Sequence, residues 1–518
     1  MAKPPNIVFV MADQLSANSV GCYGSGLSST PTMDKLAAQG VIFNRCYASS
    51  PVCAPNRANI LTGRSPAIHG IIGNNFVLTQ DNPTYAHVLQ DNGYRTGGFG
   101  KFHQTPMQSP LPESLHYLGF EESVLTEDPK LGPWLDWVEK YHPDHYRAAL
   151  AVSWPMPYMK EYGENKIDIS QHWQAAYAEY VAPLQQKSNW RYMYTSPLPK
   201  EIHQTTYITD CSLAFMRRHQ ENYADQPFFC HVSYVDPHDP YDPPEPYDQM
   251  FDPNEMKSPI STPMSVKNNP LLNEVRDRFY FAELDHKPEV VKQLRAKYHG
   301  SLRFVDDQIA RIVQYLDEND MWENTILIFT TDHGDMMGDH GLISKGNFHY
   351  DGSIRCPLIV KGAGIGRGIV SERLTCAFDF FPTFCDLASV ELRPPLEGCS
   401  FIDSLYGIDE ENDGRVCITV EMQKVRTIIT QDRWRLTVYD DNHEGELYHL
   451  AEDPEERNNL FSVSDVRAKK EELLLQLIQS YMKPSQIPQY RNFPVMNNRK
   501  YDVGPAFNFI PTYSRTKN

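Results

Sequence analysis

Short apolar runs alternate with longer amphipathic segments along most of the chain. The apolar runs are rich in β-branched and aromatic residues, and they predict buried strands over residues 6–12, 41–43, 94–99, 228–235 and 325–329. The clearest amphipathic segment spans about 289–316, where apolar residues step by three and four. Strands alternating with helices predict the α/β fold class, with a mostly parallel sheet sandwiched by helices.

Polar residues follow directly after four of these predicted strands. The four polar segments are Asp13-Gln14, Gly100-Lys101, Asp236-Pro237-His238 and Asp332-His333. In parallel α/β sheets the ligand site lies beyond the carboxyl ends of the strands. We therefore expect these side chains to meet at one edge of the sheet.

Residues 126–205 interrupt the alternation and hold five of the seven tryptophans. We interpret this segment as an insertion in a catalytic domain that spans residues 1–390. Its aromatic side chains would either wall the pocket or form a core or subunit contact, and the sequence favours neither.

The pattern changes from about residue 391. Short apolar segments at 416–421, 427–430 and 434–439, followed by a helix over 464–482, predict a smaller C-terminal α+β subdomain (391–482) with a short antiparallel sheet. The tail, 483–518, is rich in Pro, Asn and Tyr. An arm across a neighbouring subunit, in a homo-oligomeric dimer or tetramer, is one interpretation; packing along its own subunit is the other.

The overall charge narrows the choice of partners. The 518 residues carry a formal net charge of −18, which argues against nucleic acid or an anionic membrane as a partner. An anionic substrate would need a locally basic pocket. We find no signal peptide and no apolar run long enough to span a bilayer, so the cytoplasm is the expected location.

Cys53 stands apart from the other nine cysteines, which have no C-x-x-C spacing and are expected to be reduced thiols. It begins the stretch Cys53-Ala54-Pro55-Asn56-Arg57, which Leu61-Thr62-Gly63-Arg64 follows. Proline is tolerated in the first turn of a helix, so the residue at 53 would lie at the positive end of a helix dipole. Taken alone, a cysteine before a helix is more often a buried thiol.

This stretch resembles the maturation signature of the type I sulfatases, in the alkaline phosphatase superfamily. The fourth motif position, usually Ser or Ala, is Asn56, a departure that bears on the efficiency of maturation. Further segments resemble family motifs in the same order: Asp13-Gln14 (usually Asp-Asp), Gly100-Lys101-Phe102-His103, Pro237-His238-Asp239-Pro240, Thr331-Asp332-His333-Gly334, Lys345 and Glu446-Leu447-Tyr448.

The resemblance implies an alkaline-phosphatase-like fold and a formylglycine nucleophile derived from Cys53. It also implies one divalent metal ion, held by that group together with Asp13, Gln14, Asp332 and His333. Oxygen ligands suit Ca²⁺ best, while the histidine nitrogen leaves Mn²⁺ open, with Mg²⁺ as a further alternative.

The resemblance also implies roles for the basic side chains. Lys101 and Lys345 would hold the sulfate oxygens, and Arg57 would brace the nucleophile. His238 or Lys345 would protonate the leaving oxygen, and His103 would accept a proton when sulfate is expelled. Asn74 matches a polar position near the substrate in several relatives; Asn75 would serve equally. Asp339 and His340 look structural.

The leading hypothesis is a sulfuric ester hydrolase that cleaves small-molecule sulfate monoesters. It would depend on a formylglycine-generating or equivalent maturation enzyme as a partner. The alternative on the same scaffold is a phosphonate monoester hydrolase or phosphodiesterase, a branch that shares Gln14 and His333. Lys101 and His103 favour the sulfatase. A third hypothesis is a binding module in which Cys53 stays unmodified. The sequence does not choose between aryl, choline-like and sugar sulfates.

Overall fold

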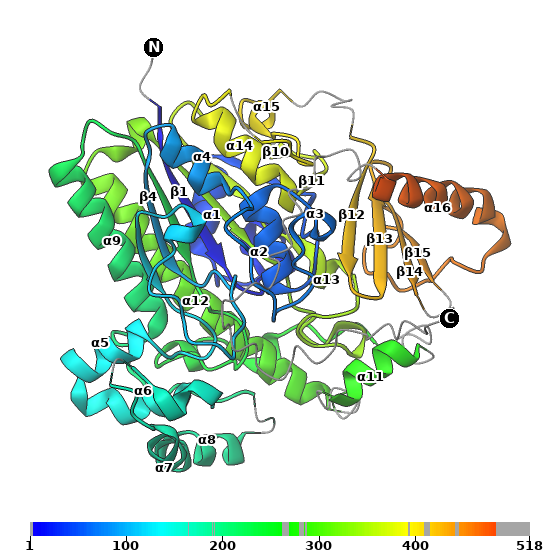
Figure 1. Ribbon diagram of the computed structural model, residues 1–518. Helices are drawn as coiled ribbons and strands as arrows, with labels where there is room; N and C mark the ends of the chain where they lie inside the picture. Colours follow the sequence, from blue (N-terminus) through cyan, green and yellow to red (C-terminus); the bar gives the residue numbers. More distant parts are fainter. Residues whose placement is uncertain are drawn as a thin grey trace, which may run out of the picture.

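A computed structural model of the protein describes residues 4–482, apart from residues 164, 189, 191, 262–268, 279–283, 285–286, 392–393, 409–414 and 441–444. Its centre is an eight-stranded sheet (Figure 1). In spatial order the strands are β10 (Ile369–Ser371), β2 (Val41–Phe43), β9 (Ile359–Gly362), β7 (Thr325–Thr331), β1 (Asn6–Ala12), β6 (Phe228–Ser233), β4 (Arg95–Gly100) and β5 (Glu122–Leu125). Only β9 runs antiparallel to its neighbours in this sheet, so the predicted mostly parallel α/β fold is confirmed.

The alternation of side chains along β1 explains why its sequence is apolar without a break. Ile7, Phe9 and Met11 enter one hydrophobic core, and Val8 and Val10 enter another on the opposite face. Successive residues of a strand point to opposite faces, so a strand covered on both sides has no solvent-facing position. The five predicted strands are all present, with ends shifted by at most two residues.

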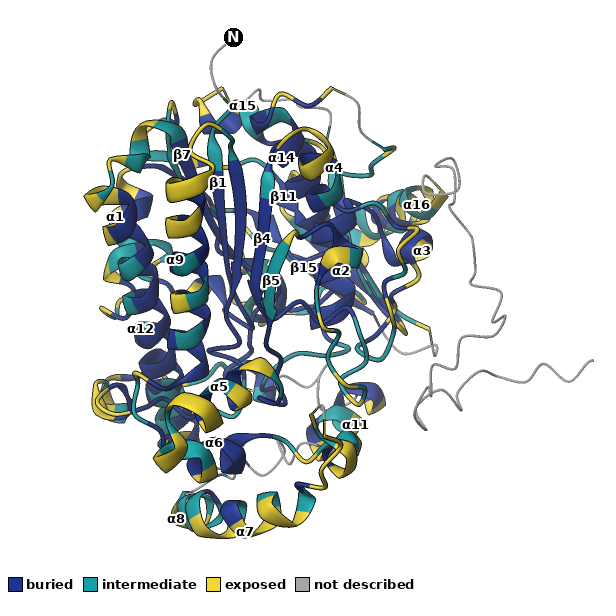
Figure 2. Ribbon diagram, turned by 60° about the vertical axis from the view of Figure 1, so that its left-hand side comes forward, coloured by how far each residue is buried: buried dark blue, intermediate teal, exposed yellow. Residues whose placement is uncertain are grey.

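Helices cover both faces of the sheet (Figure 2). On one face lie α1 (Pro31–Ala38), α9 (Gln204–Asn222) and α12 (Pro288–Glu318); on the other lie α2 (Cys53–Thr62), α4 (Tyr85–Asp91) and α14 (Phe380–Leu387). The apolar stripe of α12 packs on the first face through residues such as Leu294, Leu302 and Ile309, as its spacing predicts. Short helices α3 (Pro66–His69), α13 (Asp351–Ile354) and α15 (Ile402–Leu405) connect these elements.

The insertion forms a helical lobe below one end of the sheet, seen at the bottom of Figures 1 and 2. Its helices are α5 (Pro133–Tyr141), α6 (Tyr146–Val152), α7 (Ser170–Tyr180) and α8 (Ala182–Lys187). Trp134 is buried in the lobe's own core and donates a hydrogen bond to Ile202 O at 2.9 Å. Trp154 instead lies beside His238, with 6.5 Å between ring centroids. Trp134 therefore belongs to the core of the lobe, and the predicted wall of the pocket stays a prediction.

A second, antiparallel sheet carries the C-terminal part. Its strands are β12 (Cys417–Met422), β13 (Val425–Thr430), β14 (Trp434–Tyr439) and β15 (Glu446–His449). Helix α16 (Arg467–Met482) packs on it through Leu473 and Leu477. The predicted antiparallel sheet and helix are confirmed, and β15 is an additional strand. The tail, 483–518, lies outside the described residues, so its role as a subunit arm stays a prediction. The homo-oligomer and the domain boundaries also stay predictions. Among the described helices, none combines the length and hydropathy needed to cross a bilayer.

The C-terminal sheet encloses a buried ionic cluster around Arg435. Its guanidinium lies 3.0 Å from Glu446 Oε2 and 2.9 Å from Glu456 Oε1, between the rings of Tyr350 and Tyr448. Replacing Arg435 with methionine leaves two buried carboxylates without their cation. We expect the free energy of unfolding, measured by urea denaturation, to fall by about 3–5 kcal/mol.

The matched control is Arg467→Met at the start of α16. Arg467 pairs with Glu471, but the two side chains are 77% and 60% exposed. Water screens an exposed ion pair, so the pair adds little to stability and this variant should stay close to the parent protein. An equal loss of unfolding free energy in the two variants would show that the buried cluster stabilises the fold no more than an exposed ion pair does.

Candidate active site

The candidate nucleophile lies at the first turn of a buried helix. Val52 is extended, α2 begins at Cys53, and Pro55 occupies the first turn, where no backbone N–H is needed. Asn74 Oδ1 accepts a hydrogen bond from Ala54 N at 3.1 Å, which fastens the start of the helix. The predicted substrate contact of Asn74 stays a prediction.

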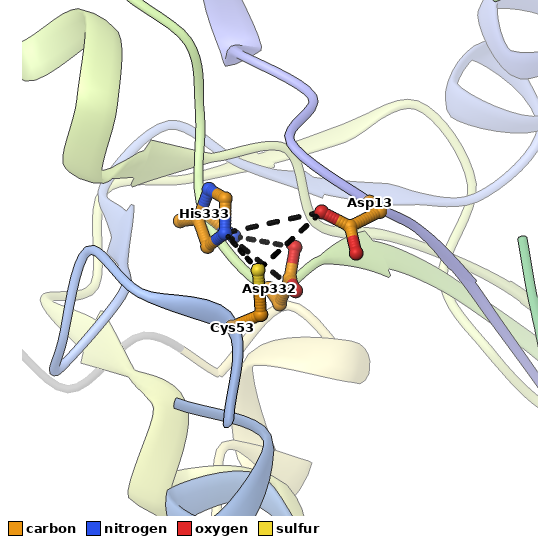
Figure 3. Close-up of side chains that lie close together, drawn as sticks. All are labelled: Asp13, Cys53, Asp332 and His333. Atoms are coloured by element: carbon orange, nitrogen blue, oxygen red, sulfur yellow. Dashed lines mark hydrogen bonds and ion pairs between the residues drawn. The ribbon is translucent and has the colours of Figure 1, made fainter. Parts of the chain in front are cut away.

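Strand register brings the two aspartates together. Ala12 and Thr331 are paired residues at the carboxyl ends of β1 and β7, so Asp13 and Asp332 emerge side by side. Ligand atoms of Asp13, Asp332, His333 and Cys53 all lie within 4.8 Å of one another, and all four residues are buried (Figure 3). Cys53 Sγ is 3.1 Å from His333 Nε2 and 3.9 Å from Asp13 Oδ1.

This cluster fits a divalent cation. Burial and the Asp332 carboxylate raise the pKa of Asp13, because two close carboxylates in a dry site lack enough positive charge. His333 Nδ1 must donate to Gly334 O at 3.0 Å, since a carbonyl can only accept. When the ring is neutral, Nε2 then presents its lone pair to the cluster, as a metal-ligating histidine requires.

Arg57 forms ion pairs with both carboxylates of the cluster. Its Nε lies 2.7 Å from Asp332 Oδ2, and its Nη2 lies 3.0 Å from Asp13 Oδ2. A third nitrogen donates to Ser233 Oγ and Lys101 O. Burial opposes the charge, but Asp332 and Asp13 raise the pKa of Arg57 above its ordinary value. Among the described residues, its hydrogen bonds go to the two carboxylates, Ser233 Oγ and Lys101 O, and its predicted role of bracing the nucleophile stays a prediction.

Lys101 is fully buried between three groups of the site. Its Nζ lies 2.5 Å from Asp13 Oδ2, 2.6 Å from Asp128 Oδ1 and 3.8 Å from Cys53 Sγ. His103 follows with Nδ1 4.0 Å from Asp128 Oδ2. Burial opposes the anion at Asp128, yet Lys101 holds the pKa of this carboxyl below its ordinary range.

Sequence reasoning did not identify Asp128. Asp128 comes after β5, a four-residue edge strand that is mostly half-buried, so no apolar run precedes it. Because β5 is parallel to β4, the two strands end at the same edge, and Asp128 reaches the same pocket as Lys101. A carboxylate pair, Glu127-Asp128, directly after a weak strand is the signal that could have revealed it.

Lys345 and His238 form a pair of basic side chains beside Gln14. Lys345 Nζ contacts both His238 Nε2 and Gln14 Oε1. His238 Nδ1 donates to Asp239 O at 2.7 Å, which leaves Nε2 facing the lysine. Nζ and Nε2 cannot both place a hydrogen between them, so one proton is shared across this contact.

The backbone at Gln14 is held in an unfavourable conformation. Its φ is 61°, which costs energy for a residue other than glycine and persists only where neighbours fix it. Gln14 N donates to Asp332 Oδ1 at 3.1 Å, and Gln14 O accepts from Tyr298 OH at 2.8 Å. These bonds keep the turn after β1 in place beside the cluster.

Asn56 links the nucleophile helix to the metal-site strand. Its Oδ1 accepts from Ser49 N at 2.9 Å and from Ser50 N at 3.2 Å, and its Nδ2 donates to Asp332 O. Neither alanine nor serine could make all three bonds, because neither carries both an amide oxygen and an amide nitrogen. The departure from the usual motif thus has a structural purpose in the folded chain.

The local charge of the pocket differs from that of the whole molecule. Burial opposes ionisation of the Cys53 thiol, but Lys101, Lys345 and His333 lower its pKa well below the ordinary value. A chain of net charge −18 therefore has a buried pocket that favours an anion at residue 53. A small anionic ester suits such a pocket.

Comparisons with known proteins agree with this fold and site. Residues 5–390 match the family described as "Sulfatase", and residues 338–483 match "N-sulphoglucosamine sulphohydrolase, C-terminal". The first match covers most of the chain. The chain belongs to the sulfatase family, within the alkaline phosphatase superfamily, and is an arylsulfatase-like sulfuric ester hydrolase.

Similar proteins include members of neighbouring branches. An arylsulfatase of Clostridium perfringens is 28% identical, over 90% of this chain and 92% of that protein. A choline-sulfatase of Rhizobium meliloti is 26% identical, over 88% of this chain and 82% of that protein. Among solved structures, the phosphonate monoester hydrolase of Agrobacterium radiobacter superposes with a TM-score of 0.72 at 25% identity, covering 93% of this chain and 96% of that one.

Proposed function

We propose that this sulfatase cleaves sulfate monoesters with a formylglycine nucleophile made from Cys53, assisted by one divalent metal ion. The observation that carries the proposal is the convergence of Cys53, Asp13, Asp332 and His333 within 4.8 Å, at the end of a buried helix and beside two lysines. Gln14 completes the proposed ligand set. The ion would offset negative charge at the nucleophile and at the sulfate oxygens.

Ca²⁺ is the proposed ion, because oxygen ligands dominate the set. Mn²⁺ or Mg²⁺ is the alternative, and the histidine nitrogen favours Mn²⁺ over Mg²⁺. To distinguish the ions, each is added at the same free concentration to metal-depleted enzyme, and the restored activity is measured. We expect Ca²⁺ to restore the highest rate.

The chain's own side chains account for binding and proton transfer. Lys101 lies 3.8 Å from Cys53 Sγ and Lys345 contacts Gln14 Oε1, and both lysines would hold the sulfate oxygens as point charges. The Lys345–His238 pair would give its shared proton to the leaving oxygen. His103, beside Asp128, would accept a proton as sulfate is expelled.

Maturation must precede folding in this proposal. The side chain of Cys53 is 0% exposed, so a formylglycine-generating or equivalent enzyme would act on the chain before α2 packs. Mass spectrometry of the peptide that contains residue 53 tests the modification. Conversion replaces sulfur with oxygen and removes two hydrogens, which lowers the mass by about 18 Da relative to the thiol. An intact thiol in active protein would contradict the proposal.

A phosphonate monoester hydrolase is the second candidate, since the similar structure from Agrobacterium radiobacter has that name. The rates for an aryl sulfate, an aryl phosphonate monoester and an aryl phosphate diester, measured with the same metal, distinguish the two. We expect the highest kcat/KM for the sulfate, because Lys101 and Lys345 suit a group with three terminal oxygens. A kcat/KM for either phosphorus substrate that is higher by orders of magnitude would favour the alternative, a phosphonate monoester hydrolase or phosphodiesterase.

A further inference from the structure

The side-chain amide of Gln14 is held at both ends. Nε2 donates to Asp335 Oδ2 at 2.6 Å. Oε1 accepts from Lys345 Nζ and, at 3.4 Å, from Ser344 Oγ. The two ends of an amide have nearly the same size, so only their hydrogen-bond partners decide which end faces which side. In this protein the oxygen faces the catalytic lysine and the nitrogen faces Asp335.

Asp335 is itself fixed so that it cannot turn. Its Oδ1 accepts from the backbone N–H groups of Met337 at 2.9 Å and Ser344 at 2.7 Å. Its Oδ2 accepts from Tyr241 OH at 2.6 Å in addition to Gln14. Asp335 is 2% exposed, so no water competes for these bonds. Two oxygens with four donors make a rigid acceptor.

We propose that Asp335 is a positioning residue that turns the Gln14 oxygen toward the metal ion, and that the two residues work as a pair of one neutral and one anionic side chain. The inference rests on the proposed function, because it assumes that residue 14 is a metal ligand. An amide oxygen can bind a hard cation, whereas an amide N–H cannot. Asp335 Oδ2, at 2.6 Å, is the closest acceptor of the amide nitrogen, whereas Asp239 Oδ1 and Tyr241 OH lie at 3.4 Å and 3.5 Å. Loss of the Asp335 acceptor would therefore weaken the hold on the nitrogen end of the amide.

The pair also sets the charge beside the substrate. A carboxylate at position 14 would add an anion next to Lys345, which is needed for the sulfate oxygens. The pair places that negative charge on Asp335 instead, where Met337 N, Ser344 N and Tyr241 OH stabilise it. A neutral ligand at position 14 therefore lets the protein hold the ion without further repelling an anionic ester.

The test exchanges the amide group at position 14 and the carboxylate group at position 335 while keeping the length of each side chain. Each single variant changes the charge, and the double variant restores the original total charge. In Asp335→Asn, the backbone donors hold the new oxygen at the Oδ1 position, so the new NH₂ group faces Gln14 Nε2, donor against donor. In Gln14→Glu, two carboxylates face each other across the 2.6 Å contact. In the double variant, the new amide NH₂ group at position 335 donates to the new carboxylate at position 14, and the contact is satisfied again.

Two measurements are made on the purified full chain. Calorimetry with Ca²⁺ gives the dissociation constant, and thermal unfolding of the metal-free protein gives the midpoint. We expect Asp335→Asn to weaken Ca²⁺ binding by about 10–100-fold, the usual effect of losing a partner that orients a ligand. We expect Gln14→Glu to unfold at a lower temperature. The double variant should recover affinity relative to Asp335→Asn and midpoint relative to Gln14→Glu.

Asp339→Asn is the matched control, the same change in the same loop. Asp339 accepts from Ile260 N at 2.7 Å and pairs with Arg295 at 2.8 Å, away from Gln14, so Ca²⁺ affinity should not change. Wild-type affinity in Asp335→Asn, or a double variant no better than either single variant, would overturn the inference. If Asp335→Asn alone does not fold, the thermal unfolding midpoints of Gln14→Glu and of the double variant are compared instead. A double variant that unfolds no higher than Gln14→Glu would then overturn the inference. If the parent protein binds none of the three metal ions, the proposed function fails instead.

Discussion

Replacing Cys53 with alanine is expected to lower kcat/KM for an aryl sulfate by about 10⁴-fold or more, the range seen when a nucleophile is removed from an enzyme. Residue 53 is the group on which Lys101, Lys345 and His333 concentrate their positive charge. Alanine keeps the helix and its buried position but carries no group that can be matured. Initial rates under single-turnover conditions, with metal in excess, measure the loss.

Cys230→Ala provides the matched control. Cys230 is also fully buried, but it lies in the middle of β6, where it pairs with Val8 of β1 and packs in the apolar core. Its replacement creates a small cavity and should lower stability slightly, with activity within about threefold of the parent. Activity of Cys53→Ala above about one-tenth of the parent value would show that the chemistry does not depend on residue 53.

The same variant addresses the binding-module hypothesis. If Cys53 stays a thiol in the natural protein, the parent chain itself should turn over no ester, and Cys53→Ala should differ from it only in ligand affinity. A large difference in rate, together with the mass change at residue 53, excludes that hypothesis. The family match makes hydrolysis the expected outcome.

The sequence predicted the site best where each group directly follows a fully buried strand. The runs that form β1 and β7 are buried on both faces, so their ends are marked by the first charged residues that follow them, Asp13 and Asp332. Adjacent parallel strands end together, and the pairing of Ala12 with Thr331 then brings the two carboxylates together. Burial on both faces thus makes these residues predictable.

The missed groups depend on contacts that local pattern does not encode. Asp128 follows a half-exposed edge strand, and Asp335 receives bonds from Gln14 and Tyr241, which are 321 and 94 positions away in the chain. Asn56 looks like a weakened motif in the sequence, yet it bonds to the backbone of Asp332, 276 positions away. Such partners become neighbours only after the sheet has formed, so spacing does not reveal Asp335 or the contacts of Asn56. Asp128 alone leaves a local signal, the carboxylate pair that follows β5.

The charge of the whole chain also has to be separated from the charge of its site. A net charge of −18 argues against polyanionic partners but says nothing about a buried pocket of a few residues. In the pocket, Arg57 is paired with Asp13 and Asp332, while Lys345 bonds to Gln14 and His238 and has no carboxylate among its hydrogen-bond partners in the described part of the chain. Positive charge thus remains available on the side where the ester would lie.

Lys101 is the second residue whose loss should be severe. Its ammonium group is 3.8 Å from Cys53 Sγ and is held between Asp13 and Asp128, so its position is fixed before substrate arrives. Removing one preorganised charge from a dry site costs about 10²–10³-fold in rate. We expect Lys101→Met to lose about 10³-fold in kcat/KM for an aryl sulfate, mostly in kcat, because charge on the sulfate oxygens changes most in the transition state.

Lys130→Met separates this effect from the cost of deleting any buried lysine. Lys130 is 4% exposed and lies 3.5 Å from Asp242, in the segment after β5, so its loss also leaves a buried carboxylate without its cation. Both variants should unfold at lower temperature, because each removes one partner of a buried ion pair. Below those temperatures Lys130→Met should keep kcat/KM within about threefold, since it touches none of the reacting groups. A similar loss of rate in both variants would assign the effect to weakened folding, and a loss of less than about tenfold in Lys101→Met would place the sulfate oxygens away from this lysine.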